Sequence, residues 1–255
     1  MNKISKNDGV MDKSKTPEGP LKRRVFLKYS TAGLAASAFV FGACEDVTQA
    51  PANASNNGKG NNANARTSDH DTVYLGSGDT GILNYAYALE QLEAAFYTTV
   101  VAEASFSSMF SEEEQMILKD LEKHEITHRE FFKTALGDNA IPGLTPDFSA
   151  IDFSSRDSVL ATAKTFEDLG VGAYNGAGKL LVDVNYLLVA GKIVSVEARH
   201  AAAIRDLINP WSMDFAGDDV IDENGFDQAL MPADVLAAAQ PFVKETIDGS
   251  ELPTS

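Results

Sequence analysis

Glu125-Ile126-Thr127-His128 and Glu197-Ala198-Arg199-His200 are the two stretches of sequence that decide the fold. In an α-helix, residues three positions apart lie on one face, so each stretch places a carboxylate beside an imidazole. In both stretches, that face also carries apolar residues that recur at helical spacing. One such pair arises often by chance, whereas two pairs in separate helical segments are a strong signal.

Two single glutamates complete the pattern. Apolar residues at helical spacing predict four helices, at residues 80–102, 111–136, 155–181 and 185–208. Glu90 lies in the apolar stripe of the first helix, and Glu167 lies in that of the third. The chain order is therefore Glu, Glu-x-x-His, Glu, Glu-x-x-His. Glu93 also faces inward on the first helix, and His124 lies at the edge of the second helix's stripe.

The link between the second and third helices, residues 137–154, is long enough to run the length of a bundle. An extended chain of this length reaches about 60 Å, whereas a helix of about 25 residues is about 37 Å long. We therefore expect these two helices to be parallel and joined by a long crossover. The predicted fold is an all-α four-helix bundle. Residues 211–255 are expected to add an acidic loop and a short helix at 232–247.

Four inward carboxylates require compensation, because an unpaired buried charge costs several kcal/mol. The inward stripes offer no lysine or arginine for this purpose. Two divalent cations would balance four negative charges. We therefore expect two metal ions in the core; the alternative is a coincidental set of solvated or core residues.

The segment Leu83–Tyr97, LNYAYALEQLEAAFY, resembles the first helix of the ferritin-like domain family, which includes plant desiccation-related proteins. The segments 124–129, 166–170 and 196–200 are similar to that family's later helices, and the resemblance covers about residues 78–210. It implies a di-iron or di-manganese carboxylate centre. Its ligands would be terminal Glu90 and Glu167, bridging Glu125 and Glu197, and one histidine for each ion, His128 and His200.

The resemblance also bears on the residues around these ligands. Glu90 precedes Tyr97 by seven residues, as the ligand precedes a tyrosine in bacterioferritin- and rubrerythrin-like proteins, so Glu90 is preferred to Glu93 as the ligand. Glu93 and His124 are then expected beside the ligands rather than on a metal. Tyr97 and Tyr174 are expected to fill the core; hydrogen bonding to ligands and electron transfer are their alternative roles.

The ligand types favour iron or manganese, because carboxylate-rich sites with few imidazoles suit these ions. Three functions remain open: an oxidoreductase of the ferroxidase, peroxidase or catalase type, a non-catalytic metal-binding or stress- and desiccation-protection protein, and a structural helical domain. No sequence feature separates the first two. Whether the chain forms a homodimer is also left open.

The composition excludes one class of partner. The chain has 21 Lys and Arg against 37 Asp and Glu, a formal net charge of −16. Binding to nucleic acid phosphates needs a positive surface, so we expect no nucleic acid partner. The single cysteine, Cys44, excludes an intramolecular disulfide framework and a cysteine-based zinc site.

Residues 1–44 have the pattern of an export signal. The string Arg23-Arg24-Val25-Phe26-Leu27-Lys28 resembles a twin-arginine signal, and an apolar run at 29–43 follows that is too short to span a bilayer comfortably. An ordinary secretory signal is the alternative. Phe41-Gly42-Ala43-Cys44 resembles a lipoprotein cleavage site, with lipidation at Cys44; cleavage near Ala43 is the alternative.

A polar segment, residues 45–77, follows the signal and is rich in Asn, Gly and Ser. Such composition is typical of a flexible tether, in which His70 is expected to be solvated. The mature protein is thus expected in the periplasm or cell envelope. Its only membrane contact would be the lipid anchor.

Twin-arginine export can be tested by changing Arg23 and Arg24 together to lysine. Because the twin-arginine route reads the arginine pair itself, we expect export to stop although the positive charge is kept. Fractionation of cells that produce either chain measures this. Normal export of the Lys-Lys chain would show that an ordinary secretory signal is used.

Overall fold

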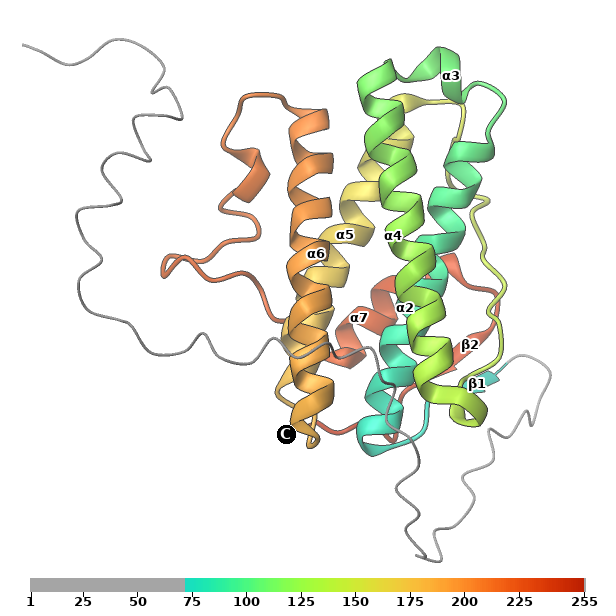
Figure 1. Ribbon diagram of the computed structural model, residues 1–255, viewed down its shortest axis with the longest axis vertical. Coiled ribbons are helices and arrows are strands. Elements are labelled where there is room, and N and C mark those ends of the chain that lie inside the picture. The colour runs from blue at the N-terminus through green and yellow to red at the C-terminus, as the bar shows by residue number, and fades with distance from the viewer. Residues whose placement is uncertain (1–71, 255) are drawn as a thin grey trace, which may run out of the picture. The chain divides into compact units, whose positions relative to one another are not determined.

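The computed structural model describes residues 72–254. Four long helices form a bundle: α2 (Gly78–Ala102), α4 (Glu112–Leu136), α5 (Arg156–Gly178) and α6 (Val184–Ile208). Helix α2 packs on α4 and α5 packs on α6 (Figure 1). The all-α bundle expected from the sequence is confirmed, with helix ends within three residues of the predicted ones. The predicted export signal with Arg23, Arg24 and Cys44, and the tether up to residue 71, lie outside the described residues.

Polar residues set the helix starts. At α4, the Ser111 hydroxyl accepts a hydrogen bond from the Glu114 amide, and the Glu114 carboxylate accepts one from the Ser111 amide. This reciprocal pair is a capping box, and the acidic first turn complements the helix dipole. Ser155 and Asp183 cap α5 and α6 through their side chains. A one-turn helix, α3 (Phe106–Met109), lies between α2 and α4 and was not predicted.

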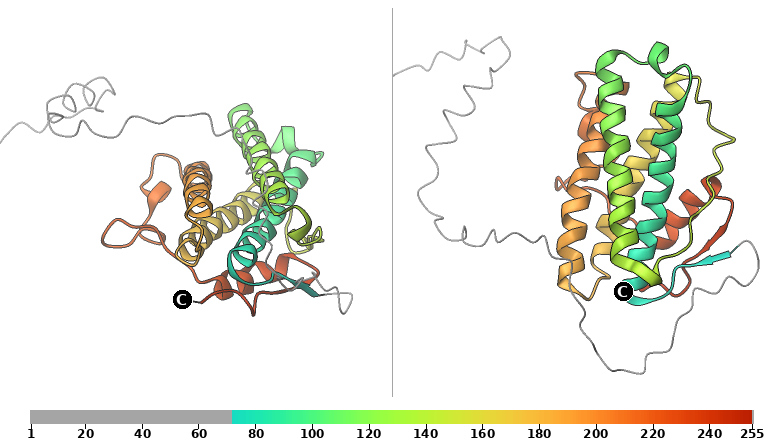
Figure 2. Two further views of the ribbon diagram at one scale, coloured as in Figure 1. Left: turned by 60° about the horizontal axis from the view of Figure 1, so that its bottom comes forward. Right: turned by 45° about the vertical axis from the view of Figure 1, so that its right-hand side comes forward.

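The crossover from α4 to α5 runs along the bundle, so these two helices are parallel, as predicted (Figures 1 and 2). Two polar side chains of α2 hold it in place. The Asn84 amide group donates to the Asn139 carbonyl, and its oxygen accepts from the Ile141 amide at 3.0 Å. Gln91 accepts from the Leu144 amide at 2.9 Å. These bonds satisfy backbone groups that a loop against a core would otherwise leave unpaired.

Both ends of the described chain depart from the sequence prediction. Residues 72–77, assigned to the tether, include strand β1 (Thr72–Tyr74), which pairs in parallel with β2 (Thr246–Asp248). Val73 and Leu75 are two residues apart, so in an extended chain both point into the core, where both are buried. The last helix, α7 (Pro232–Ala239), is shorter than the predicted 232–247. The α-helix ends before Pro241, which has no backbone N–H to continue the helical hydrogen bonds, and the chain goes on as a 3₁₀ turn at Gln240–Phe242.

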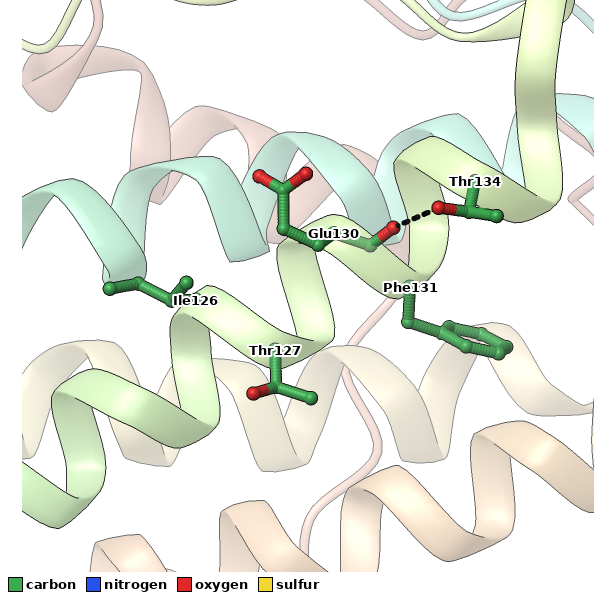
Figure 3. Close-up of a pocket in the computed structure, with 5 residues that line it drawn as sticks. All are labelled: Ile126, Thr127, Glu130, Phe131 and Thr134. Atoms are coloured by element: carbon green, nitrogen blue, oxygen red, sulfur yellow. Dashed lines mark hydrogen bonds between the residues drawn. The ribbon is translucent and has the colours of Figure 1, made fainter.

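The first half of α6 also differs from the sequence prediction, because several of its apolar side chains are exposed. Helical periodicity puts Tyr186 in the apolar stripe of α6 and Phe131 in that of α4, but their side chains are 38% and 42% exposed. Val184 and Leu188 are 61% exposed. An open groove of about 460 Å³ lies on the adjacent face of α4, where Thr127 and Phe131 point to the same side, away from the Glu130 carboxylate (Figure 3). Helix periodicity gives the apolar face of α6 but not how closely α4 approaches it.

The acidic loop after α6 is anchored by Arg205, which is only 3% exposed. Its guanidinium donates two hydrogen bonds each to Asp168 on α5 and Asp219 in the loop, at 2.7–2.9 Å. Arg205 and Lys164 hold the pKa of Asp219 well below its usual range. Asp219 is therefore a structural anchor rather than a purely solvated loop residue. None of the helices in residues 72–254 has a stretch long and apolar enough to cross a membrane.

The contact between α5 and the chain before α7 gives a stability test. A Cβ atom at Gly176 would lie 1.7 Å from the Leu230 carbonyl oxygen, whereas one at Gly191 in α6 would meet no atom within 4 Å. Gly176→Ala should therefore destabilise the protein by about 1–3 kcal/mol through overpacking. Gly191→Ala, the matched control, should stabilise it by up to about 1 kcal/mol. Urea unfolding of both variants measures this; equal effects would contradict the close contact.

Candidate metal centre

The four helices bring six predicted ligands together at the centre of the bundle. Each stands on the helix face that its apolar neighbours turn inward, so helical periodicity is what places it. The glutamates are fully buried, at 0% exposure, and His200 is 3% exposed. The six are Glu90 on α2, Glu125 and His128 on α4, Glu167 on α5, and Glu197 and His200 on α6.

Their ligand atoms form two overlapping groups, in each of which all atoms lie within 4.8 Å of one another. Glu90 and His128 belong to one group, and Glu167 and His200 belong to the other. Glu125 and Glu197 belong to both. Each group thus has two shared carboxylates, one carboxylate of its own and one imidazole.

The hydrogen bonding of these residues is incomplete. Among the described residues, ten buried side-chain nitrogen and oxygen atoms have no hydrogen-bond partner, and eight of them belong to these six side chains. The Nδ1 atom of His128 lies 2.9 Å from Glu197, and that of His200 lies 2.8 Å from Glu125. Neither contact is aligned as a hydrogen bond. Buried polar atoms are normally paired, so this concentration of unpaired lone pairs fits a bound cation.

Two tyrosines orient the unshared glutamates, and they do so crosswise. The Tyr97 hydroxyl on α2 donates to Oε1 of Glu167 on α5 at 2.5 Å. The Tyr174 hydroxyl on α5 donates to Oε1 of Glu90 on α2. In each glutamate, Oε2 is left without a partner. Both tyrosines fill the core, as expected, and they also hydrogen-bond to predicted ligands, which was one of their alternative roles.

Glu93 and His124 lie outside both groups. Glu93 is 4% exposed, and its Oε1 atom would lie 3.0 Å from a Cβ atom at Gly170 on α5. His124 is exposed, and its Nδ1 atom is 2.9 Å from Nε2 of His200. Of the two inward glutamates on the first helix, Glu90 is the one that joins the cluster.

Without a cation, protons neutralise this site. Burial raises the pKa of Glu90 and Glu93 well above the usual range, and it raises that of Glu167 to about 8. Burial alone would lower the pKa of both histidines, but the surrounding carboxylates outweigh it and raise each to about 12. Burial likewise opposes ionisation of Glu125, but the two imidazoliums lower its pKa to about 2.

Sequence reasoning missed the ion pair behind the site. Asp168 follows Glu167 directly on α5, and Arg205 lies five residues after His200 on α6. Their hydrogen bonds, at 2.7 and 2.8 Å, fix the two helices against each other next to the ligands. The sequence signal was Arg205 within the apolar end of α6, where an arginine needs a buried acidic partner.

Comparison with known proteins agrees with this geometry. No curated protein matches the chain. A family model described as a ferritin-like domain matches residues 78–210, the segment that contains all four long helices. That match spans more than half of the chain, and the chain belongs to the ferritin-like domain family.

Proposed function

We propose that this protein holds two divalent metal ions, iron or manganese, in the core of its bundle. The observation that carries the proposal is the convergence of eight unpaired buried atoms from six side chains on one place. Glu90 and His128 would hold one ion, and Glu167 and His200 the other. Glu125 and Glu197, which belong to both groups, would bridge them.

Charge supports two ions rather than one. Four ionised glutamates carry −4, which two divalent cations balance, whereas one would leave two buried charges that each cost several kcal/mol. The donor set of four carboxylates and two imidazoles suits iron(II) or manganese(II). When bound, such a pair supplies redox chemistry toward oxygen, peroxide or iron(II). The tyrosine hydrogen bonds would keep each unshared glutamate turned so that Oε2 is free to bind.

A non-catalytic, metal-holding role in stress protection is the second candidate. The enclosure of the site favours it, because the four glutamates are 0% exposed and the most open ligand, His128, has a side-chain exposure of 13%. Assays of hydrogen peroxide loss and iron(II) oxidation on the metal-loaded protein distinguish the two. Turnover supports an oxidoreductase, and retention of metal without turnover supports the second role.

We also propose that the protein works outside the cytoplasm, exported by the twin-arginine route and anchored by a lipid on Cys44. The support is the arginine pair Arg23-Arg24 and the position of the single cysteine at the end of the apolar run. Residues 72–254 carry 11 Lys and Arg against 30 Asp and Glu. That balance favours cations over nucleic acids as partners.

The metal proposal predicts the metal content of variants. The full chain, stripped of metal and then offered iron(II) or manganese(II), should retain about two ions per chain by elemental analysis. Glu125→Gln or Glu197→Gln removes a bridge, so both ions should be lost together. His128→Ala or His200→Ala should weaken one ion first.

Glu130→Gln is the matched control, because Glu130 is an exposed carboxylate on α4 that faces away from the cluster. It should leave the metal content unchanged. A folded wild-type chain that retains neither metal would overturn the assignment.

The raised pKa values predict that metal uptake releases protons. In the metal-free protein, the pKa of Glu167 is about 8 and that of each histidine is about 12, so all three hold protons at pH 7. A metal ligand must be deprotonated, so binding should expel these protons and weaken as pH falls. Calorimetric titration in buffers of different ionisation enthalpy measures the number released. Uptake at pH 7 without proton release would contradict the described charge state.

A further inference from the structure

The candidate centre has an approximate internal two-fold symmetry. Helices α2 and α4 supply Glu90, Tyr97 and the Glu125–His128 pair. Helices α5 and α6 supply Glu167, Tyr174 and the Glu197–His200 pair, with the same spacings. The crosswise tyrosine hydrogen bonds obey this symmetry too. If nothing else differed, the two halves would bind metal alike.

The residue before each Glu-x-x-His pair breaks the symmetry. It is His124 on α4 and Val196 on α6. The His124 side chain contacts the neighbouring helix: its Nδ1 atom lies 2.9 Å from Nε2 of His200 on α6. The two rings are nearly parallel, with 8° between their planes and 5.1 Å between their centroids. In the part of the chain that the structure describes, no residue makes the equivalent hydrogen bond to Nε2 of His128.

With a metal bound, this contact would decide which ring nitrogen of His200 carries the remaining proton. Nδ1 of His200 faces Glu125, Glu167 and Glu197 at 2.8–3.4 Å, so Nδ1 is the atom that would bind a metal. A neutral imidazole has only one N–H group, and a lone pair on Nδ1 requires that proton on Nε2. Nε2 then donates to Nδ1 of His124, which in turn carries its own proton on Nε2, toward solvent.

We propose that His124 is a positioning residue that holds His200 in the tautomer needed for metal binding and makes the His200 position the tighter of two unequal metal positions. The inference rests on the proposed metal function. A hydrogen-bond partner on the outer nitrogen of a metal-binding histidine fixes its ring and raises its basicity. That partner is usually a carboxylate, a carbonyl or water, and here it is an exposed histidine from the neighbouring helix. His128, without such a partner among the described residues, has Val196 in the corresponding place.

The test is a calorimetric titration of the metal-free full chain with manganese(II) or iron(II). The wild type should bind in two distinguishable steps. His124→Ala should weaken the tighter step about 10–100-fold and leave the other unchanged. His124→Asn should restore the tighter step, because the Asn side-chain oxygen takes the place of Nδ1 as acceptor.

Two controls separate positioning from folding. Lys123→Ala removes the adjacent exposed side chain, which pairs only with Asp120 in the described structure, and should leave both steps unchanged. The metal-free His124 variants should melt at the same temperature as the metal-free wild type. The inference is overturned if His124→Ala binds as the wild type does, if both steps weaken equally, or if His124→Asn gives no rescue. A wild-type chain that binds neither metal overturns the proposed function itself, and this inference with it.

Discussion

The rest of this structure depends on one constraint, the burial of four glutamate carboxylates in the core of the bundle. Transfer of one ionised carboxylate into a protein interior costs several kcal/mol after relaxation. The bundle can therefore fold stably only if every buried negative charge is neutralised. No lysine or arginine of the described residues enters the cluster, and Arg205, the buried cation, is committed to Asp168 and Asp219. Protons or metal ions must therefore supply the balance. The charge balance of the core is thus incomplete until protons or metal ions bind to it.

The architecture around the cluster serves this constraint. Parallel α4 and α5 require a crossover along the bundle, and Asn84 and Gln91 on α2 hold it. Pairing α2 with α4 and α5 with α6 gives each half one single glutamate and one Glu-x-x-His pair. The tyrosines then connect the halves, because each bonds to the glutamate of the opposite half. The orientation of Glu90 and of Glu167 thus depends on the helix pair that does not carry that glutamate.

Much of the fold and of the candidate site could be predicted from the sequence, because helical periodicity is local. It gave the four helices and the inward faces of the six clustered residues. It did not give the partners across helices: His124 with His200, Tyr97 with Glu167, or Arg205 with Asp168. Those depend on the rotation and axial offset of one helix against another, which the pattern of a single helix does not contain. The exposure of Tyr186 was missed for the same reason. The pairing of β1 with β2 was missed because it joins two three-residue segments from opposite ends of the described chain, which no local pattern connects.

The tail after α6 changes what counts as the folding unit. Phe242 packs edge-on against Phe166, the residue before Glu167, with ring centroids 4.8 Å apart. Val235 and Leu236 of α7 are buried in the same core as Val73 and Leu75, which precede α2. A fragment limited to residues 78–210 would thus leave one side of α2 and α5 open to water, beside the carboxylates that most need a dry setting. The folding unit is therefore longer than the family segment, because it also includes strand β1 before α2 and helix α7 after α6.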